Sequence, residues 1–339
     1  MTVLETASGR LATVVRTRTS TAAAILVAAV LVVSVLSVLV GSTTISPSAV
    51  LDSSDPDHPI AVARLSRTCL GLAVGAALGL AGACMQGLTR NPLADPGILG
   101  INAGASFAMV LAISVFGVSD LSSYLWFAFA GAAVTMVGVH LIAAMGRDGA
   151  TPVKLAIAGA AITAALSSWT SGVLLIDRAT MESFRFWQVG TIGGRSFDVL
   201  LTGLPFLVVG AVLALGSFRL LNALALGDDL ARGLGRRVAR DRLVLGLACV
   251  LLAGGATALA GPIAFVGLIV PHGVRAVVGG DYAKVLPFSL GYGAVLVVLA
   301  DTVGRVILPP TEVQVGIMTA VVGVPVFLYL IRRGRMGAL

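Results

Sequence analysis

The chain has 339 residues, of which 57% are hydrophobic and only 12% are charged. A water-soluble domain carries about 25% charged residues, so this composition excludes an ordinary soluble protein and favours one that lies in a membrane. The net charge of +7 would also suit a nucleic-acid-binding protein. In a membrane protein, basic loops on the cytoplasmic side account for such a charge, and we therefore expect no nucleic acid partner.

Nine stretches of the sequence contain no Asp, Glu, Lys or Arg, and most have the roughly 20 apolar residues that a membrane-spanning helix needs. A transmembrane barrel would instead show alternating strands of about 10 residues, which the sequence lacks. The predicted fold class is therefore all-α, a polytopic membrane protein in the cell membrane. The uncharged stretches are residues 22–41, 68–89, 96–119, 121–146, 155–176, 199–218, 243–274, 285–300 and 313–331.

The first uncharged stretch follows a basic segment that contains Arg10, Arg16 and Arg18. It is longer than the apolar core of a cleaved signal peptide, which has only about 7–15 residues. We therefore interpret it as a retained first span, preceded by a short cytoplasmic tail of residues 1–20.

The stretch 243–274 is too long for a single crossing. As one helix it would measure about 48 Å, whereas the hydrocarbon core of a bilayer is roughly 30 Å thick. Gly261-Pro262 lies inside it and predicts a break, because proline interrupts a helix interior. The split gives about ten transmembrane helices. An even number places both basic ends of the chain in the cytoplasm, together with most of its 23 lysines and arginines.

Residues 1–339 are interpreted as a single transmembrane domain whose largest cytoplasmic loop covers about 219–241. Cys69, Cys84 and Cys249 lie singly within apolar stretches and form no CxxC pair. Isolated cysteines of this kind are typical of packing positions, so we expect no metal site.

The chain also lacks a nucleotide-binding P-loop. That motif requires Gly-Lys followed by Ser or Thr, because the lysine reaches the nucleotide phosphates. The only two lysines, Lys154 and Lys284, follow a valine and an alanine. The chain is therefore expected not to be an enzyme and to bind no cofactor. If transport is driven by ATP, the ATP and its magnesium bind to a separate subunit.

The loop of about 219–241 predicts a short cytoplasmic helix. Two aspartates can cap its start and complement its dipole, two leucines four residues apart share one face, and a glycine can end it in the left-handed conformation. The exposed apolar edge suits docking into a groove of a partner, while an amphipathic loop held at the membrane interface is the alternative. The candidate docking residues are Asp228, Asp229, Leu230, Ala231, Leu234 and Gly235.

Two segments, 86–100 and 261–275, contain glycines and prolines that predict irregular backbone. Such backbone is tolerated at membrane depth only where protein or water satisfies it, and broken helices in transporters often border the substrate path. A tight connecting turn and ordinary packing are the alternatives, and His272 has no second ligand at metal-binding spacing. The candidate path or gate residues are Gln86, Asn91, Pro92, Gly261, Pro262, Pro271 and His272.

Three arginines lie at the outer ends of predicted spans: Arg64 and Arg67 open the second span, and Arg305 closes the ninth. One interpretation is interfacial snorkelling of long side chains. The other is a cationic patch that captures acidic groups of an external partner.

Together, these segments resemble the FecCD family, the permease subunits of type II importers for ferric siderophores, haem and cobalamin. The resemblance covers nearly the whole chain, and seven motifs follow the family's order. They are Arg64-Leu65-Ser66-Arg67, the 86–100 run with its Asn-Pro-Leu-Ala-Asp-Pro core, Trp187-Gln188-Val189-Gly190, the 226–235 loop, the 261–275 segment, Ala300-Asp301-Thr302-Val303-Gly304-Arg305, and 312–316 followed by 323–327.

The resemblance implies a dimer of ten-span subunits, homodimeric or formed with a paralogue, around a central path. It further implies two cytoplasmic ATPase subunits below and an extracytoplasmic substrate-binding protein above. In the family, arginines matching Arg64, Arg67 and Arg305 receive acidic residues of the binding protein, and coupling helices match the 228–235 region. The sequence departs from the family pattern at Ser66, where proline is usual, and at Val313-Gln314, where Leu-Pro is usual.

The resemblance implies an ATP-binding-cassette importer, with a ferric siderophore as the expected cargo and haem or cobalamin as alternatives. Two other classes of protein are the alternatives. An ion-coupled secondary transporter would need carboxylates in the middle of spans, whereas Asp301 and Glu312 lie near the outer boundary. A membrane enzyme would need clustered His, Cys or carboxylate ligands, which the sequence also lacks.

Overall fold

The computed structural model describes residues 2–43, 45–118, 121–145 and 151–332, and every regular element in these ranges is a helix. This confirms the expected all-α fold class. The helices are α1 (Thr2–Leu39), α2 (His58–Thr89), α3 (Ile101–Ser114), α4 (Leu121–Ala144), α5 (Pro152–Ile176), α6 (Arg178–Gln188), α7 (Phe197–Gly216), α8 (Phe218–Ala225), α9 (Asp228–Gly233), α10 (Val238–Cys249), α11 (Gly255–Ala260), α12 (Val266–Val278), α13 (Tyr282–Ile307) and α14 (Val315–Arg332).

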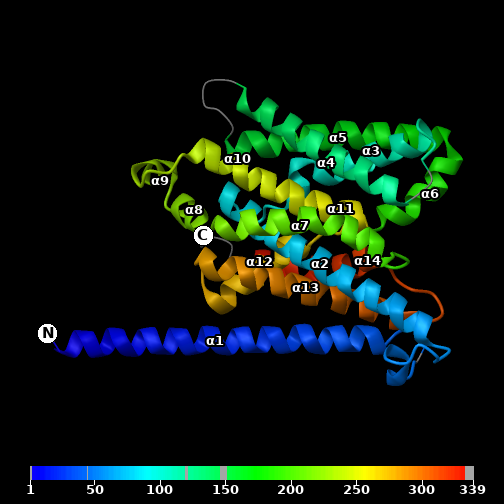
Figure 1. Ribbon diagram of the computed structural model, residues 1–339. Coiled ribbons are helices and arrows are strands. Elements are labelled where there is room, and N and C mark those ends of the chain that lie inside the picture. The colour runs from blue at the N-terminus through cyan, green and yellow to red at the C-terminus, as the bar shows by residue number, and fades with distance from the viewer. Residues whose placement is uncertain (1, 44, 119–120, 146–150, 333–339) are drawn as a thin grey trace.

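Seven of the described helices are long and apolar enough to cross a membrane. Three shorter apolar helices accompany them, namely Ile101–Ser114, Val266–Val278 and Val315–Tyr329. The long helices run side by side across the molecule, with α8 and α9 at one end and α6 at the other (Figure 1). The seven candidate spans are Thr19–Leu39, His58–Thr89, Ser123–Ala144, Val153–Ile176, Phe197–Gly216, Val238–Ala260 and Tyr282–Ile307.

The expected break at Gly261-Pro262 is present. α10, a π-helical turn at Val250–Gly254 and α11 form one continuous rod that ends at Ala260. The chain then unwinds from Gly261, which has a φ of +76°, to Phe265, which has a φ of +69°, before α12 begins. Glycine adopts a positive φ at no steric cost, so Gly261 permits the sharp change of direction that divides the long apolar stretch.

α2 forms the centre of the bundle and packs against α13 through small residues. A Cβ on Gly75 or on Gly293 would collide with the backbone oxygen of the other residue, so the two backbones approach as closely as glycine allows. Helices in a membrane associate through close packing of this kind, because moving an apolar side chain from lipid into a helix interface gives no hydrophobic stabilisation. The stretch of α2 that could span a membrane is 78% buried within this single chain.

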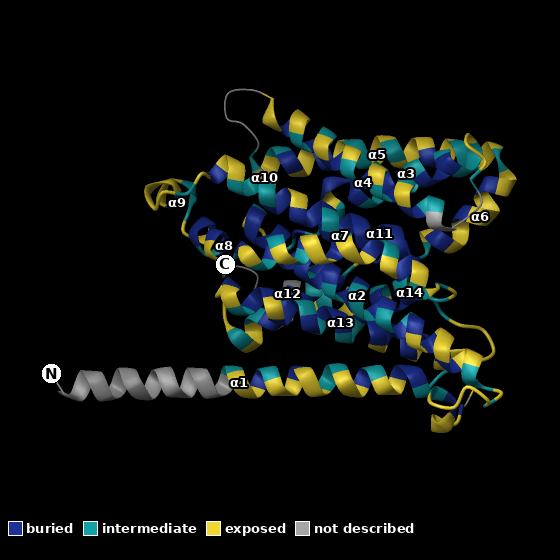
Figure 2. Cartoon of the chain, in the orientation of Figure 1, coloured by how far each residue is buried: buried dark blue, intermediate teal, exposed yellow. Residues whose placement is uncertain are grey.

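α5 contrasts sharply with α2. Only 11% of its membrane-spanning stretch is buried. Figure 2 shows exposed residues along α5 and on the surface of α1, while buried residues concentrate in the interior around α2 and α11. α5 therefore has a large surface that this chain does not cover.

Candidate functional site

An ionic cluster lies where α1 ends and α2 begins, at the α6 end of the molecule. We define it as Arg64, Arg67, Asp301, Arg305 and Glu312. The residues come from α2, from the last turns of α13 and from the segment before α14. Three cations and two carboxylates thus meet from parts of the chain that are more than 200 residues apart.

Arg67 is the centre of the ionic cluster. Its Nε donates to Asp301 Oδ2 at 2.8 Å and its Nη2 donates to Asp301 Oδ1 at 2.7 Å, a bidentate arrangement. The remaining Nη1 donates to Glu312 Oε2 at 2.6 Å. A bidentate guanidinium–carboxylate pair fixes orientation as well as distance, so Arg67 joins α2 to α13 and to the chain before α14.

Arg305 shares Asp301 with Arg67. Its Nε lies 3.3 Å from Asp301 Oδ2, and its Nη2 donates to Ser37 Oγ at 2.9 Å and to Thr302 Oγ1 at 3.1 Å. Arg305 and Asp301 are each only 1% exposed. Buried charges are stable only when they are paired, and this carboxylate compensates two guanidinium groups.

Arg64 completes the cluster and lies about one turn before Arg67 on α2. It donates to the carbonyl oxygens of Val38 at 3.3 Å, Leu39 at 3.2 Å and Thr43 at 2.7 Å. The first two are among the last carbonyls of α1, which have no partner within the helix. Arg64 therefore caps the C-terminal end of α1, where a cation also complements the helix dipole.

The structure thus brings the three predicted arginines together but does not leave them as an exposed cationic patch. Arg64 and Arg305 are buried, and the Arg67 side chain is 13% exposed. The sequence did not predict that Asp301 and Glu312 would form ion pairs with these arginines. The one local signal was the spacing of Asp301 and Arg305, four residues apart on one helical face.

At the opposite end, the short helix α9 begins at Asp228 and ends as expected. The N–H of Gly235 donates to the carbonyl of Arg232 at 2.9 Å, and the N–H of Arg236 donates to that of Ala231 at 3.1 Å. This is the Schellman arrangement, and Gly235 has the left-handed φ of +79° that it requires. Ala231 is fully buried, whereas Leu230 and Leu234 are 61% and 65% exposed. α9 therefore presents an apolar edge.

The expected capping role of the two aspartates is wrong. Neither side chain makes a capping hydrogen bond, and Gly227 occupies the N-cap position. Asp228 instead pairs with Arg90, at the end of α2, and with Arg242 of α10 at 2.9 Å. Asp229 is exposed and pairs with Arg232 at 2.9 Å. Both aspartates do lie in the first turn of α9, where they complement its dipole as expected, and the ion pairs of Asp228 fix α9 to the bundle.

α8 is also fixed to the bundle, through a second aspartate. Asn222 Nδ2 donates to Asp281 Oδ1 at 2.8 Å, and the N–H of Tyr282 donates to Asn222 Oδ1 at 3.0 Å. The hydrogen bond from Asn222 lowers the pKa of Asp281. Together with the Asp228 pairs, these bonds hold α8 and α9 as a rigid unit on α2, α10 and α13.

Gln86 ties α2 to the broken region. It is fully buried, and its Nε2 donates to the carbonyls of Gly267 at 3.2 Å and Leu268 at 3.1 Å, in the first turn of α12. Its Oε1 accepts from Arg275, whose Nη2 also donates to Tyr282 Oη at 3.2 Å. Pro271 has no N–H to donate to the carbonyl of Gly267, four residues earlier in α12, so the Gln86 amide supplies the partner that this carbonyl lacks.

Of the other predicted path residues, Asn91 lies beside Gln86, and its N–H donates to the carbonyl of Gln86 at 3.2 Å. The Gly261-Pro262 segment packs against Trp187 and Gly190, and the N–H of Thr191 donates to the carbonyl of Ala260 at 2.7 Å. Pro271 and His272 lie within α12. Asn91 is exposed and its Oδ1 accepts from the N–H of Leu93 at 2.9 Å, as a turn residue does, with Pro92 between them. The described residues contain no group of three His, Cys, Asp or Glu side chains suited to a metal ion.

Comparison with known proteins identifies the family. The model of the FecCD transport family matches residues 26–333. The chain belongs to the FecCD transport family. The ferric enterobactin transport system permease FepD of Escherichia coli K12 is 48% identical over 276 residues, which cover 81% of this chain and 82% of FepD. The Fe(3+)-citrate import system permease YfmD of Bacillus subtilis 168 is 46% identical over 286 residues, which cover 84% of this chain and 85% of YfmD.

The fold of the chain is also similar to that of a solved structure. An ABC transporter assigned to the metal-chelate type, in an inward-facing conformation, aligns with a TM-score of 0.81 and 29% identity, over 91% of this chain and 97% of that one. As a member of the FecCD family with several apolar helices, the chain is a membrane transport permease and not a catalytic enzyme.

Proposed function

We propose that this FecCD chain is the permease subunit of an ATP-binding-cassette importer that moves a ferric siderophore across the cytoplasmic membrane. The observation that carries the proposal is the identity of 46–48% to permeases named for Fe(3+)-citrate and ferric enterobactin, over more than four-fifths of the chain. Haem or cobalamin, carried by the same type of importer, is the alternative cargo.

The test of the cargo is uptake in a strain from which this chain has been deleted, with labelled ferric siderophore, haem and cobalamin supplied separately. We expect the deletion to lower siderophore uptake and the restored gene to recover it. Recovery of haem or cobalamin uptake, with siderophore uptake unaffected by the deletion, would assign the alternative cargo.

We further propose that the chain crosses the membrane ten times with both termini in the cytoplasm. The seven long apolar helices and three shorter ones support this count. The bias of basic residues supports the orientation, which places α8 and α9 in the cytoplasm.

In a cysteine-free background, a cysteine at Ser54 should react with an impermeant reagent outside intact cells, and one at Gly233 should not. External labelling at Gly233 would contradict the orientation.

A second permease chain is proposed to cover α5, as either an identical copy or a paralogue. The support is the exposure of α5, whose spanning stretch carries the polar residues Thr163, Ser167 and Ser168 and yet is only 11% buried. Polar side chains are expensive against lipid and are usually placed against protein or a water-filled path. Pairwise cross-linking of cysteines placed along α5 would test this. Its absence at every position would place the partner elsewhere.

ATP and magnesium are proposed to bind to two cytoplasmic ATPase subunits, because the sequence contains no P-loop. The contact would involve α9, through the apolar edge of Leu230 and Leu234 and the neighbouring Asp228, Asp229, Ala231 and Gly235. A rigid helix anchored by ion pairs can transmit a displacement, whereas a loose loop cannot.

An extracytoplasmic binding protein is proposed to dock at the ionic cluster that contains Arg64, Arg67 and Arg305. Because Arg64 and Arg305 are buried, the accessible part is the Arg67–Glu312 pair, whose side chains are 13% and 38% exposed. An acidic side chain of the binding protein could replace Glu312 on Arg67 Nη1. Arg64 and Arg305 would then act by holding the site together.

This docking proposal predicts that Glu312→Gln strengthens association with the binding protein. Removing an exposed competing carboxylate is worth up to about 1 kcal/mol, or about fivefold in affinity at low salt. The measurement is binding of the purified binding protein to the importer in nanodiscs. The control is Asp55→Asn, which removes a carboxylate from the segment between α1 and α2, outside the ionic cluster. An unchanged affinity in Glu312→Gln would show that Arg67 does not receive the binding protein.

The substrate path is proposed to pass the broken region, bordered by Gln86, Gly261, Pro262, Pro271 and His272, with the Asn91-Pro92 turn at its cytoplasmic end. The support is the interruption of helical structure beside a buried polar residue. A cysteine at His272 should change its rate of modification by a permeant thiol reagent when the importer turns over. Equal rates at rest and during turnover would remove His272 from the path.

A further inference from the structure

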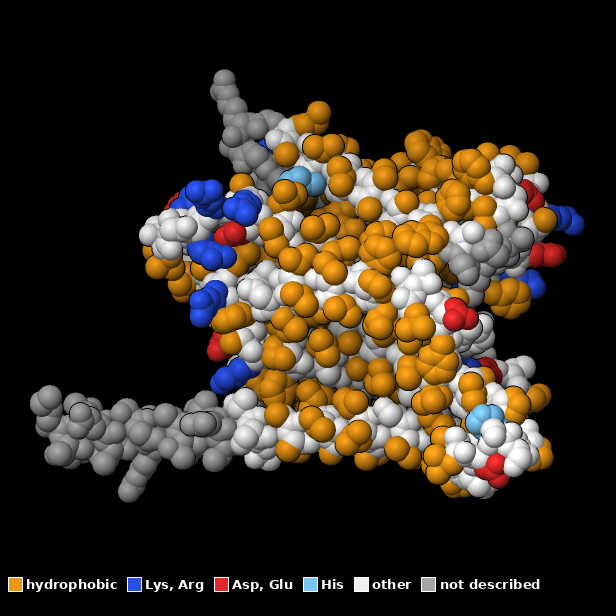
Figure 3. All heavy atoms as spheres, in the orientation of Figure 1, with side chains coloured by type: hydrophobic (Ala, Val, Ile, Leu, Met, Phe, Trp, Pro, Cys, Tyr) orange, Lys and Arg blue, Asp and Glu red, His pale blue; other side chains and the backbone are white. Residues whose placement is uncertain are grey.

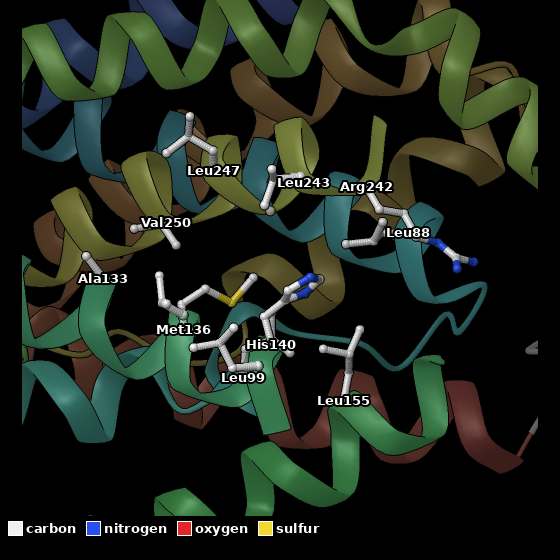
Figure 4. Close-up of a pocket in the computed structure, with 13 residues that line it drawn as sticks. Leu88, Leu99, Ala133, Met136, His140, Leu155, Arg242, Leu243, Leu247 and Val250 are labelled. Carbon is white, nitrogen blue, oxygen red and sulfur yellow. The ribbon is translucent and has the colours of Figure 1, made fainter. Parts of the chain in front are cut away.

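A groove opens on the surface between α4 and α10. Its volume is about 280 Å³, and its walls come mainly from these two helices, with Leu88 of α2 and Leu155 of α5 at one end. All the side chains that line it are apolar except His140 and Arg242. Figure 4 shows these two residues toward the same end, with the guanidinium group of Arg242 pointing out past Leu88. The groove therefore has an apolar body and a basic end.

The rim of the groove belongs to the surface that faces the membrane. Val137 and Leu141 of α4 are 57% and 63% exposed, and Leu243 and Leu247 of α10 are 61% and 52% exposed. Figure 3 shows that this face is largely apolar and that lysines and arginines gather at the end that carries α9. α4 and α10 both belong to candidate spans, and their exposed side chains here are apolar, unlike the polar residues of α5, so they suit contact with lipid.

The basic end of the groove lies near the ends of α4 and α10. His140 lies four residues before the last residue of α4, and Arg242 lies four residues after the first residue of α10. Four residues of helix measure about 6 Å, so both side chains are roughly one turn from the ends of their helices. Under the proposed orientation, these are the cytoplasmic ends.

Positive charge is in excess at this end. Arg242 pairs with Asp228 at 2.9 Å, but the same carboxylate also pairs with Arg90. Burial, together with the neighbouring charge of Arg242, lowers the pKa of Arg90. One carboxylate between two guanidinium groups leaves the mouth of the groove able to accept an anionic group.

We propose that the groove binds an anionic phospholipid of the cytoplasmic leaflet, with an acyl chain between α4 and α10 and the phosphate at Arg242 and His140. Basic pockets between membrane helices on the cytoplasmic side suit such headgroups, and guanidinium–phosphate hydrogen bonds are charge-assisted. The proposal rests on the membrane orientation given above but not on the cargo or on transport itself.

The test is lipid retention by the purified permease–ATPase complex, exchanged into bilayers with equal amounts of phosphatidylglycerol and phosphatidylcholine that carry the same acyl chains. Native mass spectrometry then counts the lipids that stay bound. We expect preferential retention of phosphatidylglycerol, reduced about fivefold by Arg242→Gln, which is the effect of one surface charge.

A second variant avoids the ion pairs of Arg242. At Gly246, an added Cβ would meet only the flexible end of Met136, at 3.2 Å, so Gly246→Leu should fill the groove and displace the acyl chain. Two controls should keep the wild-type preference. Arg240→Gln removes an exposed arginine that does not line the groove. Ala211→Leu fills a separate apolar cavity of about 140 Å³ that has no charged lining residue.

Three outcomes would overturn the proposal. Equal retention of the two lipids by the wild type would show that the groove binds acyl chains without selecting an anionic headgroup. An unchanged preference in both Arg242→Gln and Gly246→Leu would place the anionic lipid elsewhere. Efficient cross-linking between two copies through a cysteine at Val137 would show that protein covers the groove. None of these measurements involves transport, so an error in the proposed cargo would not change their outcome.

Discussion

Replacing Asp301 by asparagine should severely destabilise the folded permease. Asp301 accepts a bidentate pair from Arg67 and also faces Arg305 at 3.3 Å, at a site where it is 1% exposed. The substitution keeps the shape but removes the only buried carboxylate of the ionic cluster. Removing one partner of a buried ion pair typically costs about 3–5 kcal/mol, because the remaining charge has no compensation.

The measurement is thermal unfolding of the purified chain in nanodiscs, together with its amount in the membrane. Glu312→Gln is the matched control, since it removes the other carboxylate on Arg67 from a 38% exposed position and should cost less than about 1 kcal/mol. Adding Arg305→Met to Asp301→Asn should recover part of the loss, because it removes one of the uncompensated charges. Equal unfolding temperatures for Asp301→Asn and Glu312→Gln would contradict this account of the cluster.

Changes at the end of α9 should abolish uptake while leaving the permease folded. Gly235 has a φ of +79°, and an added Cβ there would meet nothing within 4 Å. Gly235→Trp therefore strains the Schellman turn and places a bulky ring on the proposed docking surface without clashing inside the bundle. Leu234→Asp introduces a charge at an apolar residue that is 65% exposed, so it should disturb the contact with the ATPase rather than the fold.

Uptake in vesicles, ATPase activity and co-purification of the ATPase subunit separate the possible causes. Gly235→Asn is the control for strain, since asparagine tolerates the left-handed conformation, and Leu51→Asp places the same charge at an exposed leucine far from α9. Both controls should retain co-purification. Normal uptake and normal co-purification in Gly235→Trp and Leu234→Asp would show that the coupling surface lies elsewhere.

The features predicted correctly from the sequence are those with a local cause. The break at Gly261 followed from the length of the apolar stretch and from the Gly-Pro pair, and the end of α9 followed from Gly235. Both are decided by backbone preferences of a few neighbouring residues, which a sequence displays directly.

The features that the sequence did not reveal depend on distant contacts. Asp228 could cap a helix by its position, but the fold brings Arg90 and Arg242 beside it, and two ion pairs displace the cap. Arg67 and Asp301 are 234 residues apart in sequence, so nothing local distinguishes a buried pair from an exposed cation. The burial of the predicted docking arginines could therefore be learned only from the structure.

The most direct test of the central claim is transport into proteoliposomes that contain the permease and its ATPase, with the binding protein and labelled ferric siderophore on the side that faces α6. We predict accumulation that requires ATP on the side that faces α9, that is lost when the ATPase or the binding protein is omitted, and that is unaffected by a protonophore. Accumulation driven by a proton gradient without the ATPase would contradict the account and favour an ion-coupled transporter.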